Sequence, residues 1–170
     1  MLIGNVRPVE EPAPASAPMK DAQKAEGPLL SRPWKEVAQR PESTSKTAAP
    51  NEPLPELSFQ NETTGSTIAY TTGCRRAYRN SPPSLPSIAQ ALEGGLSSIS
   101  KRQQEPLQLG NTTALKTTLT GKSGKTPVVI QSVLLARGDC IYDLTLVALE
   151  RHFHDDRIAF EKVLTKLPPR

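Results

Sequence analysis

The chain has 170 residues and a net charge of +4, from 21 Lys and Arg against 17 Asp and Glu. A chain of this length holds about one domain with some additional sequence, and the small positive charge argues against a dedicated nucleic-acid-binding protein. No apolar stretch approaches the roughly 20 residues that span a bilayer, so we expect a soluble chain that reaches a membrane only through an anchor upstream of this sequence.

The first third of the chain differs in composition from the rest. Residues 1–56 hold 10 of the 17 prolines and carry 7 basic and 8 acidic side chains, whereas residues 57–170 carry 14 and 9. Proline removes a backbone donor and favours extended conformation, and large apolar residues are few in this part. We therefore predict that residues 1–55 are a disordered Pro/Ala/Glu-rich linker and that residues 56–167 form an α+β domain.

One short piece of the linker carries a helix signal. Ser31 is a candidate N-cap and Pro33 suits a first helical turn, which would present Trp34 and Val37 to a partner. The plainer interpretation, a transient turn in a tail, is the one we favour.

The domain opens with a predicted hairpin and a helix. Residues 57–59 and 66–72 are predicted strands joined by a turn at 61–65, and a loop follows over 73–83. A helix with Ser84 as N-cap is then predicted. Five apolar residues recur at helical spacing on one face of it, namely Leu85, Ile88, Leu92, Leu96 and Ile99. Gly94 and Gly95 weaken this helix, so either it ends there and restarts or a neighbour packs closely against it.

The second half of the domain is predicted to be a three-stranded antiparallel meander. Its strands cover 111–120, 126–136 and 140–149, joined by turns at 121–125 and 137–139. Both faces of 126–136 are apolar, which predicts a central strand. Residues 107–109 are a candidate for a short extra strand.

A last helix is predicted to start at Asp155 and Asp156, which can cap it. Its apolar face is Phe160, Val163, Leu164 and Leu167. The whole pattern predicts an antiparallel sheet packed with helices.

Two candidate sites are suggested by the sequence, one by basic side chains and one by residue types that bind metal ions. The segment Gly121–Thr126 looks like a phosphate-binding loop, but it lacks the earlier glycine and is followed by a strand, so we interpret it as a basic hairpin tip. The basic side chains nominated as a contact surface are Arg75, Arg76, Arg79, Lys122 and Lys125.

His152 and His154 are metal-ligand types with i, i+2 spacing, and Asp155 adds a carboxylate. A zinc site needs three or four ligands and no second cluster is present, so we expect a solvated loop, no metal and no cofactor. A hydrolase that uses these three side chains is kept as an alternative function.

Two further groups have open interpretations. Cys74 and Cys140 lie at the ends of predicted strands, and the residues alone leave a disulfide and two buried free thiols equally open. Asp143 lies inside an apolar strand, where it either faces solvent or pairs internally, for example with Arg75 or Arg76.

The element order and one short motif resemble a known group. The stretch Ser66–Cys74, a helix, the strands Asn111–Gly121 and Val128–Ala136, and the run Gly138–Leu144 with its Cys-x-Tyr-Asp motif resemble uncharacterised bacterial envelope proteins, often lipoproteins, with a Mog1/PsbP-like domain. The resemblance covers about residues 56–167. It implies an α/β/α sandwich and favours a disulfide between Cys74 and Cys140 in an oxidising compartment.

The resemblance implies a non-catalytic binding or assembly module of the cell envelope, displayed on a flexible spacer. Its expected partner is another protein or an envelope component, not nucleic acid. Residues 1–4 show no signal peptide or lipid-acceptor cysteine, so either the start is missing or the protein is cytoplasmic. A cytoplasmic regulatory interaction protein with reduced thiols is the second alternative.

Overall fold

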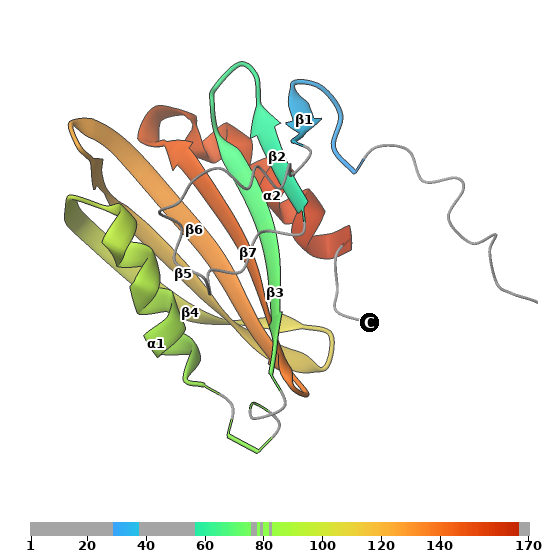
Figure 1. The fold of residues 1–170 in the computed structure, drawn as a ribbon. Coiled ribbons are helices and arrows are strands. Elements are labelled where there is room, and N and C mark those ends of the chain that lie inside the picture. The colour runs from blue at the N-terminus through green and yellow to red at the C-terminus, as the bar shows by residue number, and fades with distance from the viewer. Residues whose placement is uncertain (1–28, 38–56, 76–77, 79, 82, 167–170) are drawn as a thin grey trace, which may run out of the picture.

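The computed structural model describes residues 29–37, 57–75, 78, 80–81 and 83–166, and this part of the chain forms seven β-strands and two α-helices (Figure 1). In chain order these are β1 (Trp34–Glu36), β2 (Leu57–Asn61), β3 (Thr67–Cys74), α1 (Leu85–Ala91), β4 (Ser98–Leu109), β5 (Thr112–Ser123), β6 (Thr126–Arg137), β7 (Cys140–Leu149) and α2 (Phe153–Lys166). Short 3₁₀ turns follow α1 and precede α2.

All seven strands belong to one antiparallel sheet with the order β1-β2-β3-β7-β6-β5-β4. The predicted α+β class, the β2–β3 hairpin and the meander of β5, β6 and β7 are confirmed. The predicted central strand is also confirmed as β6. Its residues 128–135 are all buried, because β6 is paired on both sides and covered on both faces.

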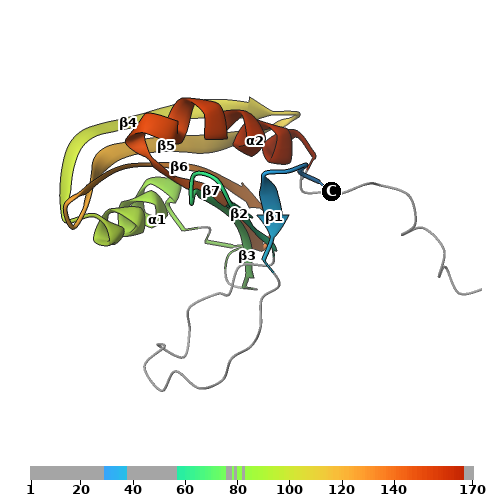
Figure 2. The same cartoon turned by 90° about the horizontal axis from the view of Figure 1, so that it is seen from above.

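The sheet carries one helix on each face (Figure 2). The larger core lies between the sheet and α2, where Phe160 and Val163 of the helix contact the side of β6 that carries Val133 and Leu135. On the opposite face, Leu134 of β6 packs against Ala89 of α1. The alternation of side chains along a strand therefore divides β6 between two cores.

The prediction that Leu96 and Ile99 continue the helix is wrong, whereas the alternative that the helix ends near Gly94 and Gly95 is confirmed in part, because the helix does not restart. α1 ends at Ala91, the 3₁₀ turn Leu92–Gly95 contains both glycines, and Ile99 lies in β4. β4 is 12 residues long and was predicted only at 107–109. It is a sheet edge whose side chains are mostly exposed, so it has no alternation of apolar and polar residues to reveal it.

The edge of β4 is protected against pairing with other strands. It contains charged side chains at Lys101 and Arg102, a proline at position 106 and a register shift between Ile99 and Lys101. Each of these features disfavours the addition of a further strand.

Neither the helical turn considered near Ser31 nor the favoured interpretation, a transient turn in a tail, is correct. Trp34–Glu36 form β1, which pairs with β2 in the register Trp34↔Asn61. Leu30 is 5% exposed and belongs to the larger core. Pairing with β2 and burial of Leu30 outweigh the local capping signal, which is a weak determinant by itself.

Residues 29–37 are thus part of the fold, although the sequence placed them in the linker. The remainder of residues 1–55 lies outside the described residues. Within the described parts, neither helix has the length and apolar composition that a membrane span requires.

Candidate functional site

A polar groove lies on the face of the sheet that carries α2. It encloses about 540 Å³ between the first turns of α2 and the strands β4, β5 and β6. The side chains that matter for its chemistry are Glu105, Lys116, Thr118, Gln131, Phe153 and Arg157. α2 packs mainly on β7, so the outer strands β4 and β5 are left as the floor of an open groove.

Gln131 is the buried polar residue of this groove. It is 2% exposed, and its Oε1 atom has no hydrogen-bond partner among the described residues. The strand register places Gln131 between Thr118 of β5 and Leu146 of β7. A buried carbonyl oxygen without a donor costs free energy. The Nε atom of Arg157, which lines the same groove, is the other buried side-chain atom that has no hydrogen-bond partner among the described residues.

The charged side chains at the groove are arranged in pairs. Lys116 Nζ lies 2.9 Å from Glu105 Oε1, and Arg157 Nε lies 3.2 Å from Glu161 Oε1. The hydrogen bond and positive charge of Lys116 lower the pKa of the Glu105 carboxyl from its ordinary value. Glu105 is therefore ionised at neutral pH, and the pair contributes both a donor and an acceptor to the rim.

α2 positions two of the lining residues by its own geometry. Asp156, Phe160 and Val163 recur at i, i+4 and i+7 and are buried. Phe153 and Arg157, at i and i+4, lie on a neighbouring face and line the groove. The helix is therefore held by one face while the adjacent face is presented to the groove.

Asp156 fixes this helix to the β2–β3 hairpin. Asn61 Nδ2 donates a 2.8 Å hydrogen bond to Asp156 Oδ1, and the hydroxyls of Thr64 and Ser66 donate to Oδ2 at 2.8 and 2.6 Å. The prediction that Asp156 helps to cap α2 is wrong, because the helix begins at Phe153 and the carboxylate is 3% exposed. Asp155 and Asp156 still lie in the first turn, where negative charge is favourable.

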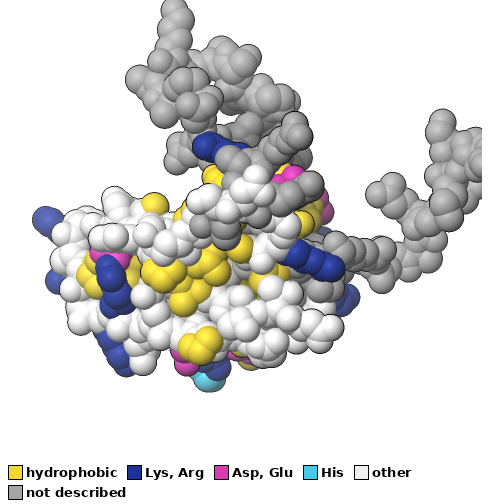
Figure 3. Space-filling model, turned by 90° about the horizontal axis from the view of Figure 1, so that it is seen from below, with side chains coloured by type: hydrophobic (Ala, Val, Ile, Leu, Met, Phe, Trp, Pro, Cys, Tyr) yellow, Lys and Arg dark blue, Asp and Glu magenta, His cyan; other side chains and the backbone are white. Residues whose placement is uncertain are grey.

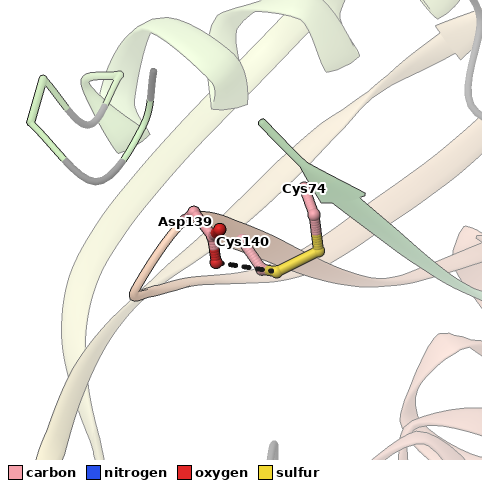
Figure 4. Close-up of a disulfide and its surroundings, with 3 residues drawn as sticks. All are labelled: Cys74, Asp139 and Cys140. Carbon is pink, nitrogen blue, oxygen red and sulfur yellow. Dashed lines mark hydrogen bonds between the residues drawn. A yellow bond between two sulfur atoms is a disulfide. The ribbon is translucent and has the colours of Figure 1, made fainter. Parts of the chain in front are cut away.

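Cys74 and Cys140 form a disulfide between β3 and β7 (Figure 4). The two residues are direct partners in the sheet register, with Cα atoms 4.0 Å apart, and the amide of Arg75 donates to the carbonyl of Asp139 at 2.8 Å. The Oδ1 atom of Asp139 lies 3.7 Å from Cys140 Sγ. The strand pairing itself brings the two sulfur atoms together.

The nominated basic residues do not form one surface. Lys122 and Lys125 lie at the β5–β6 hairpin, whereas Arg75 follows Cys74 at the other end of the sheet. The 12 residues of β6 lie between them, which is about 36 Å at roughly 3.3 Å for each of 11 steps. Arg76 and Arg79 lie outside the described residues. Arg75 stacks over the ring of Tyr78, with 5.8 Å from its Cζ to the centroid.

His152 and His154 do not meet in a reactive cluster. Arg151 Nε donates to His152 Nε2 at 3.1 Å, and the side chains of His154 and Asp155 are exposed. Neither histidine lines the polar groove. The parts of the chain that the structure describes contain no group of three His, Cys, Asp or Glu residues placed to hold a metal.

Asp143 is paired internally by hydroxyl groups. Ser132 and Thr145 each donate a 2.8 Å hydrogen bond to its Oδ1 atom. Burial raises the pKa of the Asp143 carboxyl, and these two hydrogen bonds oppose the rise. The donors are thus neighbours within the sheet, where the sequence suggested Arg75 or Arg76.

A second groove of about 410 Å³ lies near the end of the sheet that carries the β4–β5 turn. Its apolar lining is Leu109, Leu135 and Leu164. Figure 3 views the molecule from the lower end of Figure 1, where hydrophobic side chains gather in the middle of the face and Lys and Arg lie toward its margins. The polar residues that line this second groove are all at least partly exposed, so it lacks a feature equivalent to Gln131.

Only one of the groove residues carries a usable signal in the sequence. Gln131 is the single amide in the apolar run of residues 128–136, and a polar residue inside a buried strand is informative. Glu105, Lys116 and Arg157 are ordinary surface types in the sequence. They come together only through the pairing of β4 with β5 and the position of α2.

No protein-family model matches this sequence, and no curated protein sequence matches it either. Solved structures with a similar fold include a protein of unknown function from Pseudomonas aeruginosa, named as a candidate regulator. It has a TM-score of 0.45 and 15% identity over 61% of this chain and 74% of that one. They also include the cyanobacterial PsbP of Synechocystis, with a TM-score of 0.48 and 9% identity over 80% of this chain and 81% of that one. At these levels of similarity nothing about the function of this chain follows from them.

Proposed function

We propose that this chain is a non-catalytic binding module whose ligand occupies the polar groove between α2 and strands β4 to β6. The observation that carries this proposal is the Oε1 atom of Gln131, which is buried at the groove without a donor among the described residues. Native proteins rarely leave such an atom unpaired unless it has a use. The charged pairs at the rim supply further directed contacts.

The proposal places the module in the bacterial cell envelope. The disulfide between Cys74 and Cys140 supports an oxidising compartment, because such bonds are rare where thiols are kept reduced. One helix on each face of an antiparallel sheet supports the Mog1/PsbP-like α/β/α class that the sequence motif suggested. Residues 1–28 are proposed to act as a spacer between the module and an anchor.

Site-specific photo-crosslinking of the full chain, in the organism that encodes it, tests the binding site without knowledge of the ligand. A benzophenone amino acid replaces Thr118 in the groove, and in a matched control it replaces Thr113, an exposed residue of the same strand. The proposal expects an adduct from position 118 that position 113 does not give. Equal adducts from both positions, or none from 118, would contradict the groove as the binding site.

The compartment is tested separately by thiol labelling of the protein trapped with acid in cells. The envelope proposal expects both cysteines to be protected until a reductant is added. Free thiols in the trapped protein would instead support the cytoplasmic regulatory protein.

A further inference from the structure

We infer that the polar groove binds a neutral saccharide and that Gln131 recognises its hydroxyl groups. This inference rests on the proposed function, because it names the ligand class for the same groove. Its evidence is the charge balance of the groove, the type and order of its polar side chains, and one aromatic ring.

The charge balance argues against an ionic ligand. The two cationic side chains that face the groove each lie within ion-pair distance of a carboxylate, Lys116 of Glu105 and Arg157 of Glu161. The buried Nε of Arg157 makes no hydrogen bond among the described residues and remains available to a neutral acceptor. An anion would have to compete with these carboxylates, and a cation would meet the arginine and lysine heads. A neutral ligand avoids both costs.

The polar side chains form a row that suits hydroxyl groups. The strand register places Gln103, Thr118 and Gln131 side by side on β4, β5 and β6. The amide and hydroxyl groups in this row offer both donors and acceptors. A sugar hydroxyl can donate to Gln131 Oε1 and accept from a neighbouring group, whereas an apolar ligand would leave the buried oxygen unpaired.

Phe153 contributes the apolar side chain against which a saccharide can pack. Its side chain lines the groove beside Arg157 and also packs against the larger core. An aromatic ring can pack against the C–H groups of a sugar ring. The volume of about 540 Å³ lies within the range of roughly 300–1,000 Å³ that is usual for small-molecule sites.

The test is a titration of the full chain, followed by amide NMR, with maltose and N,N′-diacetylchitobiose as saccharide probes. The inference expects saturable shifts of the Gln131 side-chain amide with at least one of them. Gln131→Met should weaken that binding by about tenfold or more, because the hydroxyl loses its buried acceptor. Thr118→Val, which keeps the shape of the side chain, provides a second variant should Gln131→Met fail to fold.

A structural role for Gln131 predicts a different result. If Gln131 serves the ligand, Gln131→Met removes a buried unpaired oxygen and should leave the melting temperature unchanged or raised. The matched control is Gln60→Met, which alters an exposed glutamine of strand β2 and should change neither property. A large fall in the melting temperature of Gln131→Met alone would overturn the inference.

The outcomes separate this inference from the proposed function. If neither saccharide shifts the Gln131 amide and a neutral glutamine-rich peptide does, the assignment of a saccharide ligand is overturned. The groove would then remain a binding site. Saccharide binding that is equal in Gln131→Met and the unaltered chain would also overturn it. Absence of a crosslink at position 118 is the separate result that would remove the proposed function.

Discussion

Asn61 and Asp156 are 95 positions apart in the sequence, yet Asn61 Nδ2 donates a 2.8 Å hydrogen bond to the buried Oδ1 of Asp156. Asn61 Oδ1 in turn accepts from the backbone amides of Thr63 and Thr64 at 2.9 and 3.2 Å. The side chain of Asn61 therefore shapes the β2–β3 turn and also ties that turn to α2. Together with the hydroxyls of Thr64 and Ser66, which donate to Asp156 Oδ2, this connection helps to orient the helix that lines the groove.

Asp156→Ala is expected to lower the free energy of unfolding by about 2–4 kcal/mol, because it leaves three side-chain donors without their acceptor. Urea unfolding measures the change. Asp155→Ala is the matched control, since the neighbouring carboxylate is exposed, and it should change stability by less than about 0.5 kcal/mol. Equal effects of the two substitutions would show that the buried network does not hold α2.

Replacement of both Cys74 and Cys140 by Ser is expected to cost about 4 kcal/mol of stability. The cysteines are 66 positions apart, and a crosslink that closes a loop of this length restricts the unfolded chain by about this amount. Urea unfolding with and without a reducing phosphine measures it. The unaltered protein should lose the same stability when reduced, whereas the double variant should not respond. A midpoint that the reductant leaves unchanged would contradict the role of the disulfide.

Asp143→Asn is expected to stabilise the protein at neutral pH, because the carboxyl has a raised pKa in the folded state. The stability that a protonated Asp143 provides is present below the ordinary pKa of 3.8 and is lost as the pH rises through the raised value. Asn keeps the Oδ1 acceptor for Ser132 and Thr145 and carries no charge.

The measurement for Asp143 is the difference in unfolding free energy between the variant and the unaltered protein across pH. That difference should grow in favour of the variant from just above pH 3.8 and then level off. Taking the difference removes the contribution of the other carboxyl groups. A difference that stays constant with pH would contradict the raised pKa.

Gly121→Ala is expected to cost about 2 kcal/mol, since a Cβ at this position would overlap the carbonyl oxygen of Ser98 on β4. The matched control is Gly73→Ala in β3, where a Cβ meets nothing within 4 Å. That variant should be neutral or more stable by about 0.4–1 kcal/mol. Thermal unfolding of both proteins measures the contrast, and two equal melting temperatures would show that β4 does not lie this close to β5.

The sequence predicted those parts of the fold whose residues carry their own signal. Residues 126–136 are apolar on both faces because β6 is covered on both, and the turn at 137–139 follows from Gly138, which has a φ of 62°. β4 carries no such signal, because an exposed edge strand has no buried face to pattern. β1 is three residues long and is specified only by its pairing with β2.

The candidate site was less predictable than the fold, because its residues carry little signal of their own and come together only through strand pairing. The choice between a disulfide and two free thiols depends on the strand register, which places Cys74 opposite Cys140. Lys116 meets Glu105 because their strands pair in one particular register, and single-residue patterns do not reveal this. Gln131 is an amide within a run of apolar residues, but it is not among the candidate site residues of the sequence analysis, because both faces of that run are predicted to be apolar.

β1 also determines where the chain can be shortened. β1 pairs with the outer edge of β2, and Leu30, which precedes β1 in the chain, fills part of the larger core. A truncated protein that starts at residue 56 would lose both, and the bare backbone of β2 would be free to join a second molecule. Self-association that increases with protein concentration is therefore to be expected of such a fragment, whereas a fragment that starts at Leu29 keeps both features.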